Sequence, residues 1–230
     1  MLTLIHYPLC PFSRSVRLCL AEFGIEVDLQ EEKPWEWRQD FLEINPSGML
    51  PVLLLDEKTA ICGSYAISEY LAETAVKLHG GGRRFECFPG EAGQRAEVRR
   101  LVDWFHGKFS IESSRHILEE KVYSRYKTAS YDIDITVVRA AQENLRYHLR
   151  YVGYLAGRRN WLAGYDMSFA DLAAAAHFSA MDYLGDVPWN ECEPAKTWYT
   201  RVKSRPSFRS LLSEKIPGIA PAEIYSDLDF

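Results

Sequence analysis

The sequence has no apolar run that approaches the ~20 residues a membrane-spanning helix needs, so we expect no membrane insertion. It also has no surplus of positive charge, because 27 Lys and Arg residues face 32 Asp and Glu residues, for a formal net charge of −5. Proteins that follow a phosphate backbone usually need such a surplus, so we expect no nucleic acid among the partners. The start of the chain has no basic stretch followed by a long apolar run, which predicts a cytoplasmic protein.

Cysteine is scarce, and the five residues of this type are too widely spaced to form a CxxC pair. An odd number at such spacing argues against a disulfide framework and against a structural zinc site. The six histidines show neither an HExxH motif nor another paired-ligand spacing. We therefore expect a reducing compartment and no metal site, with stability supplied by a core that a chain of 230 residues can bury.

The first 80 residues alternate between short strand patterns and helix patterns. In order, they predict strand 2–6, helix 13–23, strand 26–31, strand 51–55, strand 60–62 and helix 64–78. Gly24 gives the first helix a glycine stop, and residues 45–48 form a turn cluster. Such a mixed order favours a sheet packed on helices.

The remainder reads as helical after a break at 80–90, where glycine and proline interrupt the pattern. Residues 169–184 are apolar nearly all round, which predicts a buried central helix. Residues 119–134, rich in Tyr, Lys and acids, are expected to be exposed. The last segment, 217–230, contains two prolines and a glycine, so we expect an irregular tail that frays unless its apolar residues find a surface on this chain or another.

Four motifs in a fixed order identify the fold. They are Cys10-Pro11-Phe12-Ser13 before the first helix, Gly48 to Leu53 with a proline at a strand start, the capping-box-like Ser168-Phe169-Ala170-Asp171, and Arg205-Pro206-Ser207-Phe208 near the end. Together they resemble the glutathione transferase superfamily along nearly the whole chain. The resemblance implies an α/β plus all-α fold, with a thioredoxin-like domain (1–80), a linker (81–92), an all-helical domain (93–216) and a C-terminal tail (217–230).

The resemblance also implies a place for glutathione. The bond before Pro51 would be cis, which exposes the backbone of Leu50 to a peptide-like ligand. Ser64 and its helix N-terminus would take a carboxylate. In members that bind glutathione a Glu or Gln precedes that serine, but here the residue is Gly63, and Met49 stands where a lysine is common. A lost hydrogen bond to a charged group costs roughly 1.5–3 kcal/mol, so we expect glutathione to bind weakly or not at all.

Cys10 and Ser13 are the candidates for catalysis. A cysteine before a helix can become a thiolate because the positive helix end lowers its pKa, and in cysteine-type members the matching residue forms mixed disulfides with glutathione. In serine-type members a residue near Ser13 activates the glutathione thiol. The alternative is that Ser13 is only an N-cap and Cys10 a small loop residue. An enzyme of this kind, a glutathione transferase or thiol transferase with glutathione as its cofactor, is the rival hypothesis.

Several surface features favour a binding protein without a cofactor. Trp35 and Trp37 stand two apart among charged residues, as in an interface hot spot, although one could pack inward while the other covers the domain interface. Arg115 and Glu119 lie in a mixed-charge aromatic stretch that taken alone would be a solvated face. The tail ends with alternating acidic and apolar residues, from Ile224 to Phe230.

This combination resembles the FtsZ-binding, glutathione-transferase-like division proteins of alphaproteobacteria. It implies a non-catalytic homodimer that binds FtsZ filaments and modulates their curvature and constriction, and that is concentrated at the division site. The interface candidates are Trp35, Trp37, Arg115, Glu119, Asp227 and Phe230. An adaptor with a different partner is a third hypothesis.

Overall fold

Four short strands form one mixed sheet in the computed structural model, which describes residues 2–79, 85–127 and 130–228. The strands are β1 (Thr3–His6), β2 (Asp28–Glu31), β3 (Val52–Leu54) and β4 (Ala60–Cys62), in the spatial order β2-β1-β3-β4. β1 pairs parallel with β2 and antiparallel with β3, and β4 pairs antiparallel with β3. Leu4 and Leu53 lie opposite each other in this sheet and are fully buried, so the predicted sheet is confirmed.

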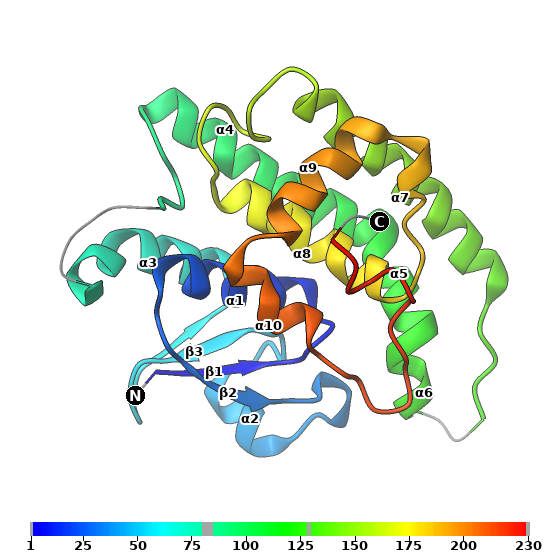
Figure 1. Cartoon of the computed structure of the whole chain (residues 1–230). Helices are drawn as coiled ribbons and strands as arrows, with labels where there is room; N and C mark the ends of the chain where they lie inside the picture. The colour runs from blue at the N-terminus through cyan, green and yellow to red at the C-terminus, as the bar shows by residue number, and fades with distance from the viewer. Residues whose placement is uncertain (1, 80–84, 128–129, 229–230) are drawn as a thin grey trace.

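Helices α1 (Pro11–Phe23) and α3 (Ser64–His79) cover the side of the sheet that faces the rest of the chain, and α2 (Gln39–Ile44) lies on the other side (Figure 1). α1 begins with proline at its first position and ends at Gly24, which has φ +68° and donates its N–H to the Ala21 carbonyl at 3.0 Å. Glycine tolerates this left-handed conformation without steric cost, which explains the stop that the sequence predicts.

The second half of the chain is helical throughout its regular elements. They are α4 (Ala92–Asp103), a π-helical stretch (Trp104–Ser114), α5 (Arg115–Leu118), a second π-helical stretch (Glu119–Tyr123), α6 (Ser124–Lys127), α7 (Ile135–Ala156), α8 (Phe169–Tyr183), α9 (Glu193–Lys203) and α10 (Arg209–Leu212). Short 3-10 turns occur at Pro34–Glu36, Trp189–Glu191 and Pro206–Phe208. None of the helices within the described ranges has the length and apolar character that a membrane crossing demands.

The elements from α4 to α6 run end to end as one long helix. The expectation that residues 119–134 are exposed is therefore wrong in its first part, because Val122 and Ser124 are buried in this helix. The many polar side chains of residues 119–127 suggested exposure of the whole segment, but only one face of this helix meets solvent. The other face packs against the neighbouring helices and the thioredoxin-like domain.

Helix α8 is buried along its whole length, as its all-round apolar sequence predicts. Its N-terminus has the predicted capping box, in which Ser168 and Asp171 bond each other's backbone. One side of α8 packs on α1, so α8 joins the two halves of the molecule.

Candidate functional site

A cleft of about 600 Å³ opens between the thioredoxin-like part and the long helix that begins with α4. Its walls come from the start of α1, the loops 34–37 and 47–50, and the helix face 106–127. Most of the lining side chains are aromatic or aliphatic. The cleft brings together seven of the residues singled out from the sequence: Cys10, Trp35, Trp37, Met49, Leu50, Arg115 and Glu119.

The two tryptophans have different surroundings. Trp35 is half-buried at the domain interface, where its ring stacks on Tyr126 at 5.3 Å and lies 5.4 Å from Tyr123. Trp37 is exposed and has φ 49°, and a Cβ on Gly48 would lie 3.3 Å from its ring. Trp35 is therefore the tryptophan that covers the domain interface. Trp37 remains available to a partner.

The cleft has an exposed apolar rim. Trp37, Met49 and Ile111 line the cleft yet are 67%, 62% and 62% exposed. Glu119, also at the cleft, forms an ion pair with Lys127 that neutralises it, whereas Arg115 is exposed and has no ion pair within the described ranges. The rim is therefore apolar with one uncompensated positive charge.

Cys10 and Ser13 lie next to each other at the start of α1, but the surroundings of Cys10 oppose a reactive thiolate. Cys10 is the N-cap residue and is partly exposed at the cleft wall. Burial raises the pKa of its thiol, and hydrogen bonds from Ser13 and Phe12 only partly offset this. Ser13 is fully buried in the first turn of the helix, where its Oγ accepts the Tyr7 N–H at 3.4 Å. Ser13 is thus not the N-cap, and the pKa of Cys10 shifts in the direction opposite to the one that a reactive thiolate needs.

The remnant of a glutathione site is incomplete. The Leu50–Pro51 peptide bond is cis, as the resemblance implied, and Leu50 lines the cleft. Gly63 has φ +89° and Ser64 begins α3. A side chain at position 63 would be in the left-handed region, which costs roughly 1–2 kcal/mol, so a carboxylate could be restored there only with strain. Within the described ranges no group of three or more His, Cys, Asp or Glu side chains could hold a metal ion.

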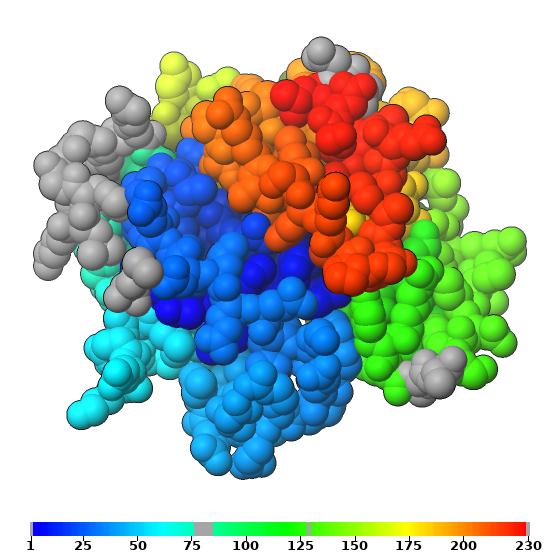
Figure 2. Space-filling model, turned by 60° about the horizontal axis from the view of Figure 1, so that its bottom comes forward, coloured from blue at the N-terminus to red at the C-terminus, as the bar shows by residue number. Residues whose placement is uncertain are grey.

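The C-terminal segment docks on its own chain, which is one of the two surfaces that the sequence left open for its apolar residues. In Figure 2 it lies against the region of α9 and α10. Tyr225 is fully buried, and its hydroxyl donates to the Leu211 carbonyl and accepts from Arg14, both at 3.1 Å. Asp227 remains exposed near this anchor, whereas Phe230 lies outside the described residues. Of the two tail residues, the structure thus places Asp227 alone, and it lies outside the cleft.

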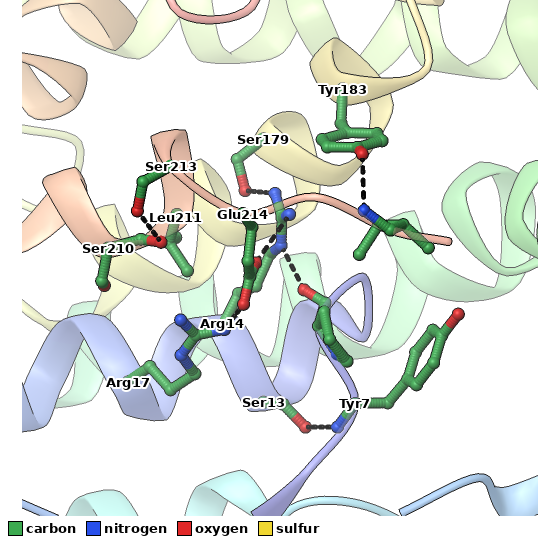
Figure 3. A network of polar contacts seen from close by, with 12 residues as sticks. Tyr7, Ser13, Arg14, Arg17, Ser179, Tyr183, Ser210, Leu211, Ser213 and Glu214 are labelled. Atoms are coloured by element: carbon green, nitrogen blue, oxygen red, sulfur yellow. Dashed lines mark hydrogen bonds and ion pairs between the residues drawn. The ribbon is translucent and has the colours of Figure 1, made fainter. Parts of the chain in front are cut away.

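Arg14 is at the centre of the contact between α1 and the C-terminal segment (Figure 3). The sequence interpretation did not identify this structural role. Its guanidinium is fully buried and donates to the Pro8 carbonyl at 2.7 Å, to Ser179 at 2.9 Å and to Glu214 at 3.3 Å. Glu214 also pairs with Arg17. An arginine inside the apolar repeat of a helix was the available signal, because a buried charge needs partners.

Two histidines form a buried hydrogen-bond chain between α1 and α8. Ser15 donates to the Phe12 carbonyl at 2.8 Å, so its Oγ accepts from His106 Nε2 at 3.2 Å. His106 Nδ1 then accepts from His177 Nε2 at 3.0 Å, and His177 Nδ1 accepts from Ser114 at 2.8 Å. Every bond in this chain is satisfied only while both rings are neutral. Burial lowers the pKa of His106 to about 3 and lowers that of His177 well below its usual range.

Acidification should therefore destabilise the fold. Because the folded state holds these histidines neutral, their contribution is complete above the unfolded pKa and is lost as pH falls below it. Between pH 7.5 and 5.5 each should lower the free energy of unfolding by about 1.4 kcal/mol. Urea unfolding at both pH values measures this loss, and His106→Asn should reduce it by about that amount.

The exposed His116 supplies the matched control. His116→Asn should leave the pH dependence unchanged, because His116 is exposed and lies outside the buried hydrogen-bond chain. Asp171 and Asp182, whose pKa values burial raises, act in the opposite direction, and the comparison with His106→Asn subtracts them. An equal pH loss in wild type and His106→Asn would contradict the neutral chain.

Together, family, sequence and structure comparisons relate the chain to glutathione S-transferases and to one FtsZ-localized protein. The family model of the glutathione S-transferase N-terminal domain matches residues 9–74. The chain is 44% identical to FtsZ-localized protein A of Caulobacter vibrioides over 231 residues, covering 99% of this chain and 98% of that protein. A crystal structure of a glutathione S-transferase from Sinorhizobium meliloti superposes with a TM-score of 0.94 at 45% identity, covering 100% of both chains. The structure of FzlA from C. crescentus superposes with a TM-score of 0.91 at 43% identity, covering 100% of this chain and 99% of that one.

Proposed function

Because the chain belongs to the glutathione S-transferase superfamily and is related over its whole length to FtsZ-localized protein A, we propose that it is a non-catalytic regulator of bacterial cell division. It binds FtsZ filaments as a homodimer and modulates their curvature and constriction. The observation that carries this proposal is the 44% identity over 99% of the chain. It is favoured over transferase activity because Gly63 and Met49 stand where the resemblance implies a Glu or Gln and commonly a lysine to hold glutathione.

The rim of the cleft is the proposed contact with the filament. Trp37, Met49 and Ile111 offer apolar area that water now covers, and Arg115 offers a charge that can orient a partner. FtsZ filaments present repeated copies of one surface, so a two-fold pair could engage neighbouring subunits and gain avidity. Trp35 and Glu119 contribute indirectly, since both are already paired within this chain.

Co-sedimentation with GTP-assembled FtsZ tests this contact. Trp37→Ala and Arg115→Glu should each weaken binding by at least tenfold, because truncating an interface hot spot costs about 2 kcal/mol or more. Arg139→Glu, which changes an exposed arginine outside the cleft lining, is the matched control and should pellet as wild type does. Wild-type pelleting by both cleft variants would remove the rim from the proposal.

The tail requires a carefully placed truncation. A cut after Ser226 removes Asp227 and Phe230 but keeps the buried Tyr225, so the anchor of the tail is retained while the predicted tail contact is lost. A cut before Tyr225 would remove a hydrogen-bond partner of the buried Arg14, so weaker pelleting could then reflect a loss of stability instead of a lost contact with FtsZ. Equal pelleting of intact protein and the protein cut after Ser226 would exclude the tail from the contact.

Calorimetric titration with glutathione separates this proposal from the enzyme. A regulator of this kind should give no binding in the micromolar range. Micromolar binding, together with turnover that Cys10→Ala or Ser13→Ala abolishes, would instead establish a transferase.

A further inference from the structure

A second hollow, of about 430 Å³, lies where α7 ends and α9 begins. Arg159, Asn160, Thr197, Trp198 and Arg201 are among its lining residues. The loop that follows α7 is at the top of Figure 1, whereas α2 and α6 are at the bottom, so the hollow is remote from the interdomain cleft. The two share no lining residue.

Arg201 holds a charge that the chain does not compensate. Its guanidinium carbon lies 3.3 Å from the centre of the Trp161 ring, and its amino groups donate to the Asn160 carbonyl at 2.6 Å and to Asn160 Oδ1 at 3.4 Å. No carboxylate pairs with it within the described ranges. Burial lowers the pKa of Arg201, and Arg205 lowers it further while Asp171 raises it. An anion beside this guanidinium would relieve an unfavourable environment.

Arg158, which directly precedes the lining residue Arg159 in the chain, adds a positive charge beside an aromatic ring. Arg158 lies 3.9 Å from the centre of the exposed Tyr154 ring and donates to the Tyr154 carbonyl at 3.4 Å, again without a carboxylate partner in the described residues. Arg159 pairs with Glu97 at 2.7 Å, but that carboxylate also pairs with Arg100. Arg158 and Arg201 are therefore the two arginines here without a carboxylate partner in the described residues, against one acid in the lining, Glu193.

The loop that carries these groups is held in one conformation. Trp161 and Gly164 form an antiparallel bridge, and Asn160 Nδ2 donates to the Tyr165 carbonyl at 2.7 Å. A preformed loop pays little ordering entropy on binding. Arginine beside an exposed tyrosine such as Tyr154 is also a composition that is enriched at interface hot spots.

We propose that this hollow is a docking site for an acidic segment of a partner protein. Two of the five guanidinium N–H groups of Arg201 are taken by Asn160, and the others remain to bind a carboxylate. Ala156 and Pro194, which line the hollow and are not buried, offer apolar surface to a side chain of the same segment. Glu193, the one acid in the lining, opposes long runs of phosphate and limits how many carboxylates can enter. The inference does not rest on the proposed binding of FtsZ.

Fluorescence anisotropy with a fluorescein-labelled decapeptide of alternating Glu and Leu tests the proposal. Wild-type protein should bind it below 1 mM, and the affinity should fall as salt rises because surface charges are screened. Arg201→Glu and Arg158→Glu should each weaken binding by at least fivefold. Glu193→Gln should strengthen it two- to threefold, which a merely structural role of this surface would not produce.

One variant and one peptide of opposite charge control for nonspecific binding. Arg139→Glu should bind the peptide as wild type does, and a peptide of alternating Lys and Leu should not bind. Absence of binding at 1 mM, or equal binding by wild type and both arginine variants, overturns the proposal. Displacement of the peptide by a single-stranded oligonucleotide at lower concentration than by unlabelled peptide also overturns it, because the site would then select nucleic acid.

Discussion

Replacing Asp171 by alanine is expected to lower the free energy of unfolding by about 4 kcal/mol, because several buried donors then lose their acceptor. Asp171 is fully buried at the start of α8. Its Oδ1 accepts from the Leu162 N–H at 2.9 Å and from Trp198 Nε1 at 3.0 Å. Its Oδ2 accepts from the N–H of Ser168 at 3.0 Å and from its hydroxyl at 3.2 Å. Urea unfolding followed by circular dichroism measures the loss.

Asp171→Asn is the matched control for this prediction. It keeps one acceptor oxygen and nearly the same volume, but turns an amide NH₂ toward donors, so it should cost roughly half as much. A variant Asp171→Ala with wild-type stability would show that α8 does not depend on its capping box. Equal stability of the Ala and Asn variants would show that neither the retained acceptor oxygen nor the retained volume contributes, so that the loss would come from removing the carboxylate itself.

Replacing Tyr225 by alanine is also expected to cost about 4 kcal/mol, since truncating a buried aromatic side chain typically costs 3–5 kcal/mol. The ring is fully buried and lies 5.0 Å from Tyr183. Its hydroxyl is one of the partners of the buried Arg14, which would lose this hydrogen bond. Chemical denaturation should show the loss, and the exposed end of the tail should become sensitive to proteolysis.

Tyr225→Phe separates the contribution of the ring to stability from that of the hydroxyl, and Ser226→Ala is the surface control. Tyr225→Phe removes only the hydrogen bonds to Arg14 and Leu211 and should cost about 2 kcal/mol. The neighbouring Ser226 is exposed, so Ser226→Ala should change stability by no more than about 0.5 kcal/mol. Wild-type stability in Tyr225→Ala would mean that the tail does not dock on its own chain in solution.

Local patterns were enough to predict most of the fold. Gly24 marked the end of α1, and the spacing of Ser168 and Asp171 marked the start of α8, because both signals act within one helical turn. The resemblance to the superfamily supplied the order of the domains and the cis bond before Pro51. These features depend on neighbours in the sequence or on a motif, so no contact between distant residues had to be known.

Contacts between distant residues decided the features that the sequence could not predict. Tyr225 meets Arg14 across 211 positions, so the docked tail had no local signal. Trp35 packs on Tyr126 in the helical part of the chain, so Trp35 is a contact between domains and not an exposed anchor for a partner. At Cys10 the local rule predicted a lowered pKa, but the burial of the thiol in the assembled fold reversed the direction.

The π-helical stretch Trp104–Ser114 makes the cleft sensitive to insertions and deletions in evolution. A π-helical turn accommodates an extra residue relative to an α-helix, so it sets the rotational phase of everything that follows. Deleting one residue there would turn the downstream helix by about 100°, given 3.6 residues per turn. Arg115 and Leu118 would then point away from the cleft, so lineages that keep this surface must keep the length of the stretch as well as its residues.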